Sequence, residues 1–270
     1  MKLVGETALV TGGASGIGKA IAAALLEQGA NVAVIDKDAE TSEQARAELE
    51  QAHDARGRLV WKVGTVTSAA DVDDVLDAAA EAFGGVEMLV NNAGTASLAL
   101  IVDTSEEDWD LIVDTCLKGT FLCTRAFAQR AIAAGAPGAI VNIASLNAVA
   151  ATDGLGHYCA AKAGVVQFSQ VAAGELGRYG IRVNAIGPGT TRTPLGVGFT
   201  VGRMGDEFLD RILIGPDKRH QEASDIADVT LFLLSDAAQR VTGHFIPVDG
   251  GQHVRGLHSY WDVAKEQGLV

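Results

Sequence analysis

The chain has 270 residues, of which 48% are hydrophobic, and its 21 basic and 34 acidic side chains give a formal net charge of −13. This excess of acidic side chains argues against binding of a nucleic-acid phosphate backbone. The sequence shows no basic patch that would compensate for the negative charge, so we expect no nucleic-acid partner. The length and hydrophobic content suit a single α/β domain with one large core.

The first predicted strand, residues 7–10, leads through a glycine-rich turn into a strongly helical stretch. In this strand–turn–helix context, Gly12 permits a tight turn, Gly16 lets the backbone approach a pyrophosphate, and Gly18 lets the helix lie close to the sheet. The start of the helix then faces the phosphates. The turn therefore predicts a dinucleotide site, with contacts from Gly12, Ser15, Gly16, Ile17 and Gly18.

The second predicted strand, residues 31–35, ends on Asp36, eighteen residues past Gly18. A carboxylate at this position can bind both ribose hydroxyls of NAD. It would repel the extra phosphate of NADP, because two anions would share a partly desolvated site. We therefore predict NAD as the cofactor, while an ordinary turn residue at a strand end is the alternative interpretation of Asp36.

Helical stretches separate five further predicted strands, at residues 59–64, 86–90, 139–144, 181–186 and 245–248. Such alternation predicts parallel strands covered on both faces. We expect an α/β fold in one domain: a Rossmann-like, doubly wound, parallel sheet of seven strands with helices on both faces. Residues 1–251 would form the dinucleotide-binding and catalytic domain, and residues 252–270 a C-terminal tail.

Three residues in the middle of the chain suggest redox chemistry. Ser145 follows the apolar run at residues 139–144, at the strand edge where open α/β sheets bind ligands. Tyr158 and Lys162 stand four residues apart and share a face if this stretch is helical. The ammonium then lowers the pKa of the phenol from its usual value near ~10, so that the phenol can exchange a proton with an alcohol. A packed ring beside a solvated amine is the alternative.

Taken together, these motifs resemble the short-chain dehydrogenase/reductase family over residues 1–251. The glycine pattern, the Asn-Asn-Ala-Gly element, the serine, tyrosine and lysine, the Pro-Gly segment and the closing Val-Asp-Gly-Gly occur in the family's order. In this sequence they are residues 11–18, residues 91–94, Ser145, Tyr158, Lys162, residues 187–193 and residues 248–251.

The resemblance implies a role for each matching residue. Ser145 would hydrogen-bond the substrate oxygen, Tyr158 would act as acid and base, and Lys162 would hold the ribose and tune Tyr158. Thr193 would contact the nicotinamide carboxamide, although a helix N-cap before Pro194 is an alternative role. The other implied cofactor contacts are Asn92 and Gly94 on the adenosine side, and Pro188, Gly189 and Thr191 along the nicotinamide half.

Two positions depart from the family pattern. Thr65, followed by Val66, stands where the family usually places an aspartate that meets the adenine. We expect Thr65 and Val66 to contact the cofactor still, at a cost on the order of 1 kcal/mol for one exchanged hydrogen bond. Cys116 occupies the position of an asparagine that helps seat a water linking the lysine to solvent. Three interpretations stay open: a tolerated substitution, an impaired enzyme, or a redox-sensitive site.

The cysteines and histidines indicate neither disulfides nor a metal. Cys116, Cys123 and Cys159 show no CxxC spacing, and an odd number without an export signal favours free thiols. The six histidines show no zinc spacing, so we predict no catalytic metal. We expect no direct catalytic role for His157, because consecutive helical residues point in different directions.

Substrate choice is expected to depend on residues 146–157 and 194–215. Both stretches are fairly apolar, and four glycines would let the second move as a lid. We predict a medium-sized, mainly hydrophobic secondary alcohol or ketone, cyclic ones included, although Arg192 and Arg203 leave an anionic group open. The candidate pocket residues are Leu146, Val149, Leu155, Leu195, Val197, Phe199, Val201, Met204 and Phe208.

The sequence thus predicts an NAD-dependent oxidoreductase acting on a CH–OH group of a small-molecule substrate. Two alternatives stay open: a 3-oxoacyl-carrier-protein reductase, and a dinucleotide-binding regulatory protein whose chemistry Cys116 has weakened. The N-terminus resembles neither a signal peptide nor a membrane span, so we expect a cytoplasmic protein without membrane partners.

The resemblance to the family implies a homotetramer. The tail, with His253, His258, Tyr260 and Trp261, would cover a neighbour's active site or end as a locally packed or disordered segment.

Overall fold

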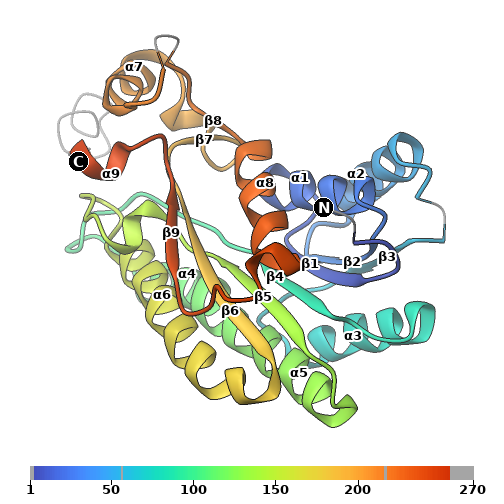
Figure 1. The fold of residues 1–270 in the computed structure, drawn as a ribbon. Helices are drawn as coiled ribbons and strands as arrows, with labels where there is room; N and C mark the ends of the chain where they lie inside the picture. Colours follow the sequence, from blue (N-terminus) through green and yellow to red (C-terminus); the bar gives the residue numbers. More distant parts are fainter. Residues whose placement is uncertain (1–2, 56, 216–217, 256–270) are drawn as a thin grey trace.

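The computed structural model describes residues 3–55, 57–215 and 218–255, and its centre is a parallel sheet of seven strands (Figure 1). The strand order is β3-β2-β1-β4-β5-β6-β9, so the chain reverses its direction across the sheet between β1 and β4. In such sheets, this switch point is where ligands bind. The strands are β1 (Thr7–Thr11), β2 (Asn31–Asp36), β3 (Leu59–Val63), β4 (Met88–Asn91), β5 (Gly138–Ile143), β6 (Ile181–Pro188) and β9 (Phe245–Val248).

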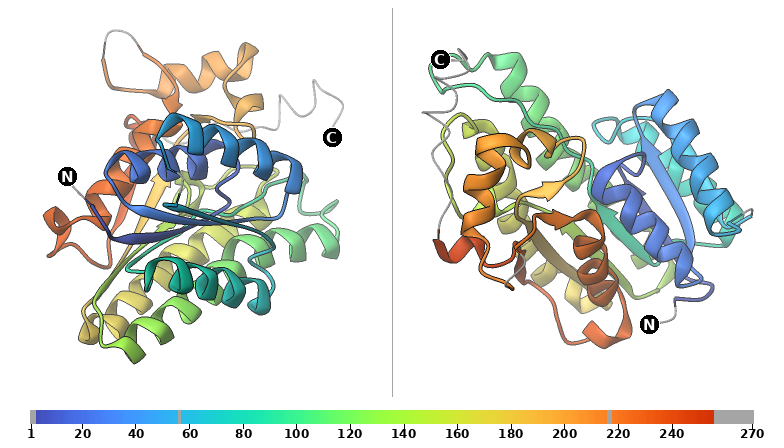
Figure 2. Two further views of the ribbon diagram at one scale, coloured as in Figure 1. Left: turned by 90° about the vertical axis from the view of Figure 1, so that its right-hand side faces the viewer. Right: turned by 90° about the horizontal axis from the view of Figure 1, so that it is seen from above.

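Helices cover both faces of this sheet (Figures 1 and 2). One face carries α1 (Gly16–Glu27), α2 (Ala39–Ala52) and α8 (Ala223–Leu234). The other carries α3 (Ala69–Phe83), α5 (Gly119–Ala134) and α6 (Gly156–Leu176). The predicted doubly wound fold and all seven predicted strands are therefore confirmed.

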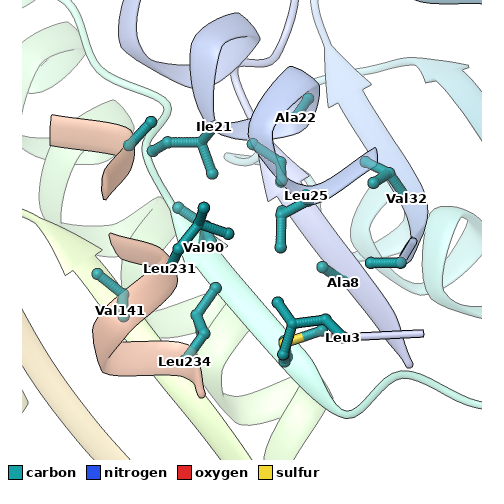
Figure 3. Packing of buried hydrophobic residues seen from close by; sticks show 14 of the residues in the cluster. Leu3, Ala8, Ile21, Ala22, Leu25, Val32, Val90, Val141, Leu231 and Leu234 are labelled. Atoms are coloured by element: carbon teal, nitrogen blue, oxygen red, sulfur yellow. The ribbon is translucent and has the colours of Figure 1, made fainter. Parts of the chain in front are cut away.

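The core has two halves because successive side chains of a strand point to opposite faces. Ala8 and Val10 of β1 belong to the half under α1 and α8, whereas Leu9 belongs to the half over α3 and α5. In Figure 3, Ile21 of α1 and Leu231 of α8 pack together over the sheet. Full burial of an aliphatic side chain contributes roughly 1.5–3 kcal/mol, so these layers hold the strand ends in fixed positions.

A smaller unit stands beside the sheet, next to the ends of β6 and β9. The strands β7 (Thr191–Arg192) and β8 (Gln221–Glu222) form a separate parallel pair, and α7 (Gly202–Arg211) lies beyond them (Figure 1). The sequence analysis did not predict these elements, because two-residue strands leave no period-two pattern. No helix in the described ranges is both long and apolar enough to span a membrane.

The folded part continues past the predicted domain end at residue 251. The short helix α9 (Gln252–Arg255) follows β9, and Gln252 is completely buried. The backbone N–H of Thr190 donates to its Oε1 at 3.0 Å, and its Nε2 donates to the carbonyl oxygen of Phe208 at 3.3 Å. Gln252 thus ties the segment after β6 to α7. The predicted tail residues His258, Tyr260 and Trp261 lie outside the described residues.

Candidate active site

The glycine-rich turn between β1 and α1 is closed from behind by Asn92. The Asn92 side-chain amide donates to the carbonyl oxygens of Thr11 and Gly12, at 3.0 and 2.9 Å. A Cβ on Gly18 would overlap the Gly12 carbonyl oxygen, so only glycine lets α1 start this close to the strand. Gly12 and Gly16 have φ values of +66° and +53°, which glycine adopts without strain. The geometry agrees with the close packing predicted for Gly18 and with the tight turn predicted for Gly12, whereas the approach of Gly16 to a pyrophosphate stays a prediction.

Asp36 ends β2 with its carboxylate fixed at the mouth of this turn. Its two oxygens accept hydrogen bonds from the backbone N–H groups of Ala14, at 3.0 Å, and Asp38, at 3.2 Å. Ser15 is the N-cap residue of α1, yet its hydroxyl makes no capping hydrogen bond and is exposed. The turn therefore offers a hydroxyl and the start of a helix on one side and a carboxylate on the other.

A cavity of about 760 Å³ runs from Asp36 along the turn to Ser145. Nearly every residue that the sequence analysis assigned to the cofactor or to catalysis lines it, and the exceptions are Gly18 and Cys116, which lie behind its wall. The predicted residues on the wall are Gly12, Ser15, Gly16, Ile17, Asp36, Thr65, Val66, Asn92, Gly94, Ser145, Tyr158, Lys162, Pro188, Gly189, Thr191 and Thr193.

The catalytic candidates come together at one end of this cavity. Ser145 follows β5, and Tyr158 and Lys162 lie on the first turns of α6. The Lys162 ammonium lies 5.6 Å from the centre of the Tyr158 ring and donates to the Ile143 carbonyl oxygen at 2.8 Å. Lys162 is buried, with 4% of the residue exposed, and the hydrogen bond to Ile143 holds its ammonium group in place.

The pKa of Tyr158 differs from the expectation. Burial raises the pKa of the phenol above its usual value, while Lys162 and a hydrogen bond from Ser145 lower it. The net direction is upward. Lys162 acts in the predicted sense, but desolvation of the phenolate outweighs it.

Asn147 belongs to the site, although the sequence analysis did not single it out. Its backbone N–H donates to the Ser145 hydroxyl at 3.1 Å, and its side-chain Oδ1 accepts from that hydroxyl at 3.2 Å. Its side-chain Nδ2 donates to Thr152 at 2.7 Å. Asn147 also lines the cavity. A polar side chain two residues after the serine, in an otherwise apolar loop, was the available signal.

Cys116 lies in a π-helical turn between α4 (Glu106–Val113) and α5, at residues 114–118. Such turns frequently mark functional sites. The thiol is buried and donates to the Thr95 carbonyl oxygen at 3.5 Å. A Cβ built on Gly94 would lie 3.5 Å from this sulfur and 3.4 Å from the Lys162 ammonium, so the thiol and the ammonium both lie close to the same glycine. Lys162 is nevertheless anchored by β5 and not by Cys116.

Thr65 makes local contacts at the adenosine end. Its backbone N–H donates to the Asp71 carboxylate at 2.8 Å, and its hydroxyl lies 2.9 Å from that of Thr67. Asp71 thereby lies directly behind the position where the family usually has an aspartate. The chain thus keeps a carboxylate near this strand end, one layer behind the cavity wall.

The substrate end is apolar, but only part of the predicted set forms it. Val149, Val197 and Val201 are exposed and do not line the cavity. Met204 packs behind the wall in a cluster with Leu155 and Phe208. The members of the predicted set that line the cavity are Leu146, Leu155, Leu195, Phe199 and Phe208.

Neither arginine considered for an anionic substrate lines the cavity. Arg192 pairs with Glu222 at 3.1 Å and Arg203 with Glu207 at 3.0 Å, both on the outside.

Thr193 does not cap a helix, which corrects the alternative role considered for it. Its hydroxyl instead accepts from the Gly196 N–H at 3.0 Å and closes a turn.

Comparisons with known proteins agree with this geometry. A family model described as enoyl-(acyl carrier protein) reductase matches residues 12–253. A solved short-chain type dehydrogenase/reductase from Mycobacterium ulcerans superposes with a TM-score of 0.92 at 32% identity, over 98% of this chain and 96% of that one. D-threitol dehydrogenase of Mycolicibacterium smegmatis is 42% identical over 254 residues, 94% of this chain and 95% of that protein. The chain belongs to the short-chain dehydrogenase/reductase family.

Family membership confirms the resemblance seen in the motifs. A second relative, 3-oxoacyl-(acyl-carrier-protein) reductase of Staphylococcus epidermidis, is 36% identical over 251 residues, 92% of this chain and 99% of that protein. As a short-chain dehydrogenase/reductase, the protein is an oxidoreductase for alcohol-type small molecules that uses a nicotinamide dinucleotide, NAD or NADP.

Proposed function

We propose that the protein is an NAD-dependent dehydrogenase that interconverts an uncharged secondary alcohol and its ketone, with Tyr158 as acid and base. The observation that carries the proposal is the placement of Ser145, Tyr158 and Lys162 at one end of a single cavity whose other end is Asp36. The turn fits a dinucleotide, because Gly12, Gly16 and the exposed Ser15 line the cavity directly in front of the start of α1. A Cβ on Gly18 would overlap the Gly12 carbonyl oxygen behind the turn, so glycine lets the helix start this close.

A bound dinucleotide supplies the acceptor or donor of the hydride at C4 of its nicotinamide. The chain's own residues handle the proton. During alcohol oxidation, the Tyr158 phenolate takes the proton of the substrate hydroxyl as the carbinol C–H bond breaks. Lys162 stabilises that phenolate by its charge, and the Ser145 hydroxyl hydrogen-bonds the substrate oxygen. In the reverse direction, the phenol returns the proton to the ketone oxygen.

The preference for NAD is supported by the acidic side chains around the adenosine end. Asp36 is held by two backbone N–H groups, and Asp38 lies beside it on the cavity wall. A 2′-phosphate would share this space with two carboxylates, which is unfavourable. Lys37 also lies on this wall and offers a cation to the same region, but it does not remove the carboxylate at Asp36.

An uncharged substrate is supported by the charges on the rest of the wall. The described cations of the cavity are Lys37 and Lys162, at the adenosine end and beneath the tyrosine. The acidic residues number five: Asp36, Asp38, Glu107, Asp110 and Asp114. An anionic thioester would meet like charge on approach, which disfavours the second candidate, a 3-oxoacyl-carrier-protein reductase. The third candidate, a regulatory protein without activity, is disfavoured because Ser145, Tyr158 and Lys162 are all present at the cavity.

The cytoplasmic location and the homotetramer expected from the sequence remain predictions.

The test is NADH formation with a panel of secondary alcohols, using wild type and Asp36→Ser, each with NAD and NADP. We expect wild type to use NAD at least tenfold more efficiently. Asp36→Ser should narrow that ratio by lowering activity with NAD and raising it with NADP. Equal use of both cofactors by wild type would refute the preference, and no oxidation of any alcohol would refute the dehydrogenase.

A further inference from the structure

Asn147 is a polar side chain in the apolar part of the cavity that the reaction described above does not use. It is half-buried beside Leu146 and lines the cavity within hydrogen-bond distance of Ser145. Its side-chain Nδ2 is held from behind, at 2.7 Å from the buried Thr152 hydroxyl and 3.8 Å from the Cys159 sulfur. These contacts use both amide hydrogens and point Oδ1 toward Ser145.

The hydroxyl proton of Ser145 has competing acceptors. In the structure the hydroxyl lies 3.2 Å from Oδ1 of Asn147, and it can donate its proton to this oxygen or to the Tyr158 oxygen. When Ser145 instead donates to a substrate oxygen, Oδ1 loses its donor while its amide group stays fixed. A carbonyl oxygen left without a donor in an apolar cavity is unfavourable. A substrate that brings its own donor to this point restores the bond.

The position of that donor follows from the geometry. Oδ1 lies one hydrogen-bond length from Ser145 Oγ, the atom that contacts the reacting oxygen in the proposed mechanism. A hydroxyl on the carbon next to the reacting carbon lies one hydrogen-bond length from the reacting oxygen when the two C–O bonds are gauche. Such a hydroxyl reaches Oδ1 while its neighbour contacts Ser145 and Tyr158. More distant hydroxyls face the apolar wall formed by Leu155 and Phe208.

We propose that Asn147 is the specificity residue for a second oxygen on the adjacent carbon, and that the substrates are vicinal diols, oxidised to α-hydroxyketones. The proposal rests on the dehydrogenase activity proposed above and narrows its substrate class. The chemistry is unchanged: one carbinol loses hydride to NAD and a proton to Tyr158, and the second hydroxyl only donates a hydrogen bond to Asn147.

The test compares 2,3-butanediol stereoisomers with 2-butanol, and the 1,2-cyclohexanediols with cyclohexanol, at saturating NAD. We expect wild type to favour the best diol over the matched mono-alcohol at least tenfold in kcat/KM, beyond the factor of about two for having two hydroxyls. In Asn147→Leu that preference should fall to the statistical factor. Asn147→Asp, which keeps an acceptor oxygen but loses the amide hydrogens that orient it, should retain part of the preference.

Thr152→Val tests the fixed orientation of the amide, and we expect it to lose part of the preference. Val149→Ala serves as the control, because this exposed side chain is in the same loop but away from the cavity. Melting temperatures within a few degrees of wild type establish that each variant is folded.

The outcomes separate the two proposals. If Asn147 only positions Ser145, Asn147→Leu lowers kcat for diols and mono-alcohols by the same factor, and the specificity role is wrong. Wild type that oxidises mono-alcohols as well as diols overturns the inference and leaves the dehydrogenase standing. Wild type without activity on any alcohol removes the dehydrogenase, and the inference falls with it.

Discussion

The pKa of Tyr158 is subject to two opposing influences, burial and the charge of Lys162. Burial of the phenol disfavours the phenolate and raises its pKa, whereas Lys162 favours the phenolate. Lys162 is held by the Ile143 carbonyl oxygen at the end of β5, so its charge stays beneath the ring. The sheet therefore influences the pKa of Tyr158 by placing one ammonium group near its ring.

The first prediction concerns this ammonium group. Lys162→Met removes the charge that lowers the pKa of Tyr158, so that pKa should rise further. Oxidation needs the phenolate, and its fraction falls whenever pH lies below the pKa. The kcat/KM for alcohol oxidation should therefore fall at least tenfold at pH values below the pKa, and the pH at which activity stops rising should move upward. A variant whose activity levels off at the same pH as that of wild type would contradict this electrostatic role.

The second prediction concerns Cys116. Cys116→Asn restores the residue usual in the family, but Lys162 is anchored by the Ile143 carbonyl oxygen, and the thiol donates to the Thr95 carbonyl oxygen. We expect kcat to change by less than about fivefold, because one exchanged hydrogen bond is worth about 1 kcal/mol or less here. A gain of tenfold or more in steady-state turnover would show instead that the cysteine impairs the natural enzyme.

At the element scale, the glycine-rich turn depends on how closely α1 approaches the sheet. It depends on Gly18, where a Cβ would overlap the Gly12 carbonyl oxygen and crowd the Asn92 side chain. Backbone cannot move aside as a flexible side chain can. The start of the helix and the turn therefore form one rigid piece.

The third prediction follows from that contact. Gly18→Ala should destabilise the protein by about 1–3 kcal/mol, as overpacking does, and weaken NAD binding at least tenfold. Gly174→Ala is the matched control in α6, where a Cβ meets nothing within 4 Å. It should stabilise the protein by up to about 1 kcal/mol and leave binding unchanged. Chemical denaturation and calorimetric titration measure both; equal effects of the two substitutions would contradict the packing argument.

The long elements were predictable from sequence, and the short ones were not. Strand β1 is buried on both faces and reads as a continuous apolar run, and Gly12, Gly16 and Asp36 follow fixed spacings. Strands β7 and β8 have two residues each, and the π-helical turn around Cys116 has no sequence pattern of its own. The roles of Asn147 and Gln252 arise from contacts made only in the folded chain. The net direction of the Tyr158 pKa likewise depends on burial, which spacing does not reveal.

At the scale of the whole molecule, the net charge of −13 continues into the cavity, whose wall carries more carboxylates than ammonium groups. Such a field repels anions as they approach, and salt screens it over about 10 Å at 0.1 M. The smaller unit beside the sheet, with α7 tied to the segment after β6 through Gln252, adds no cation to the cavity wall among the described residues.

The fourth prediction uses this field to test the carrier-protein alternative. At saturating NADH, kcat/KM for acetoacetyl-CoA should be low in dilute buffer and rise several-fold when ionic strength increases from about 0.01 to 0.15 M. For the neutral ethyl acetoacetate it should change less than twofold. High efficiency with the thioester at low salt would favour an acyl-thioester reductase over a dehydrogenase of uncharged alcohols.

The central claim is that Tyr158 transfers the proton while the dinucleotide carries the hydride, and one comparison tests it directly. NAD binding and NADH formation are measured for wild type and Tyr158→Phe with the best alcohol found. We predict that the Kd for NAD stays within about threefold while kcat falls on the order of 10³-fold, as expected for loss of a general base. Turnover that survives the substitution with NAD still bound would contradict the claim.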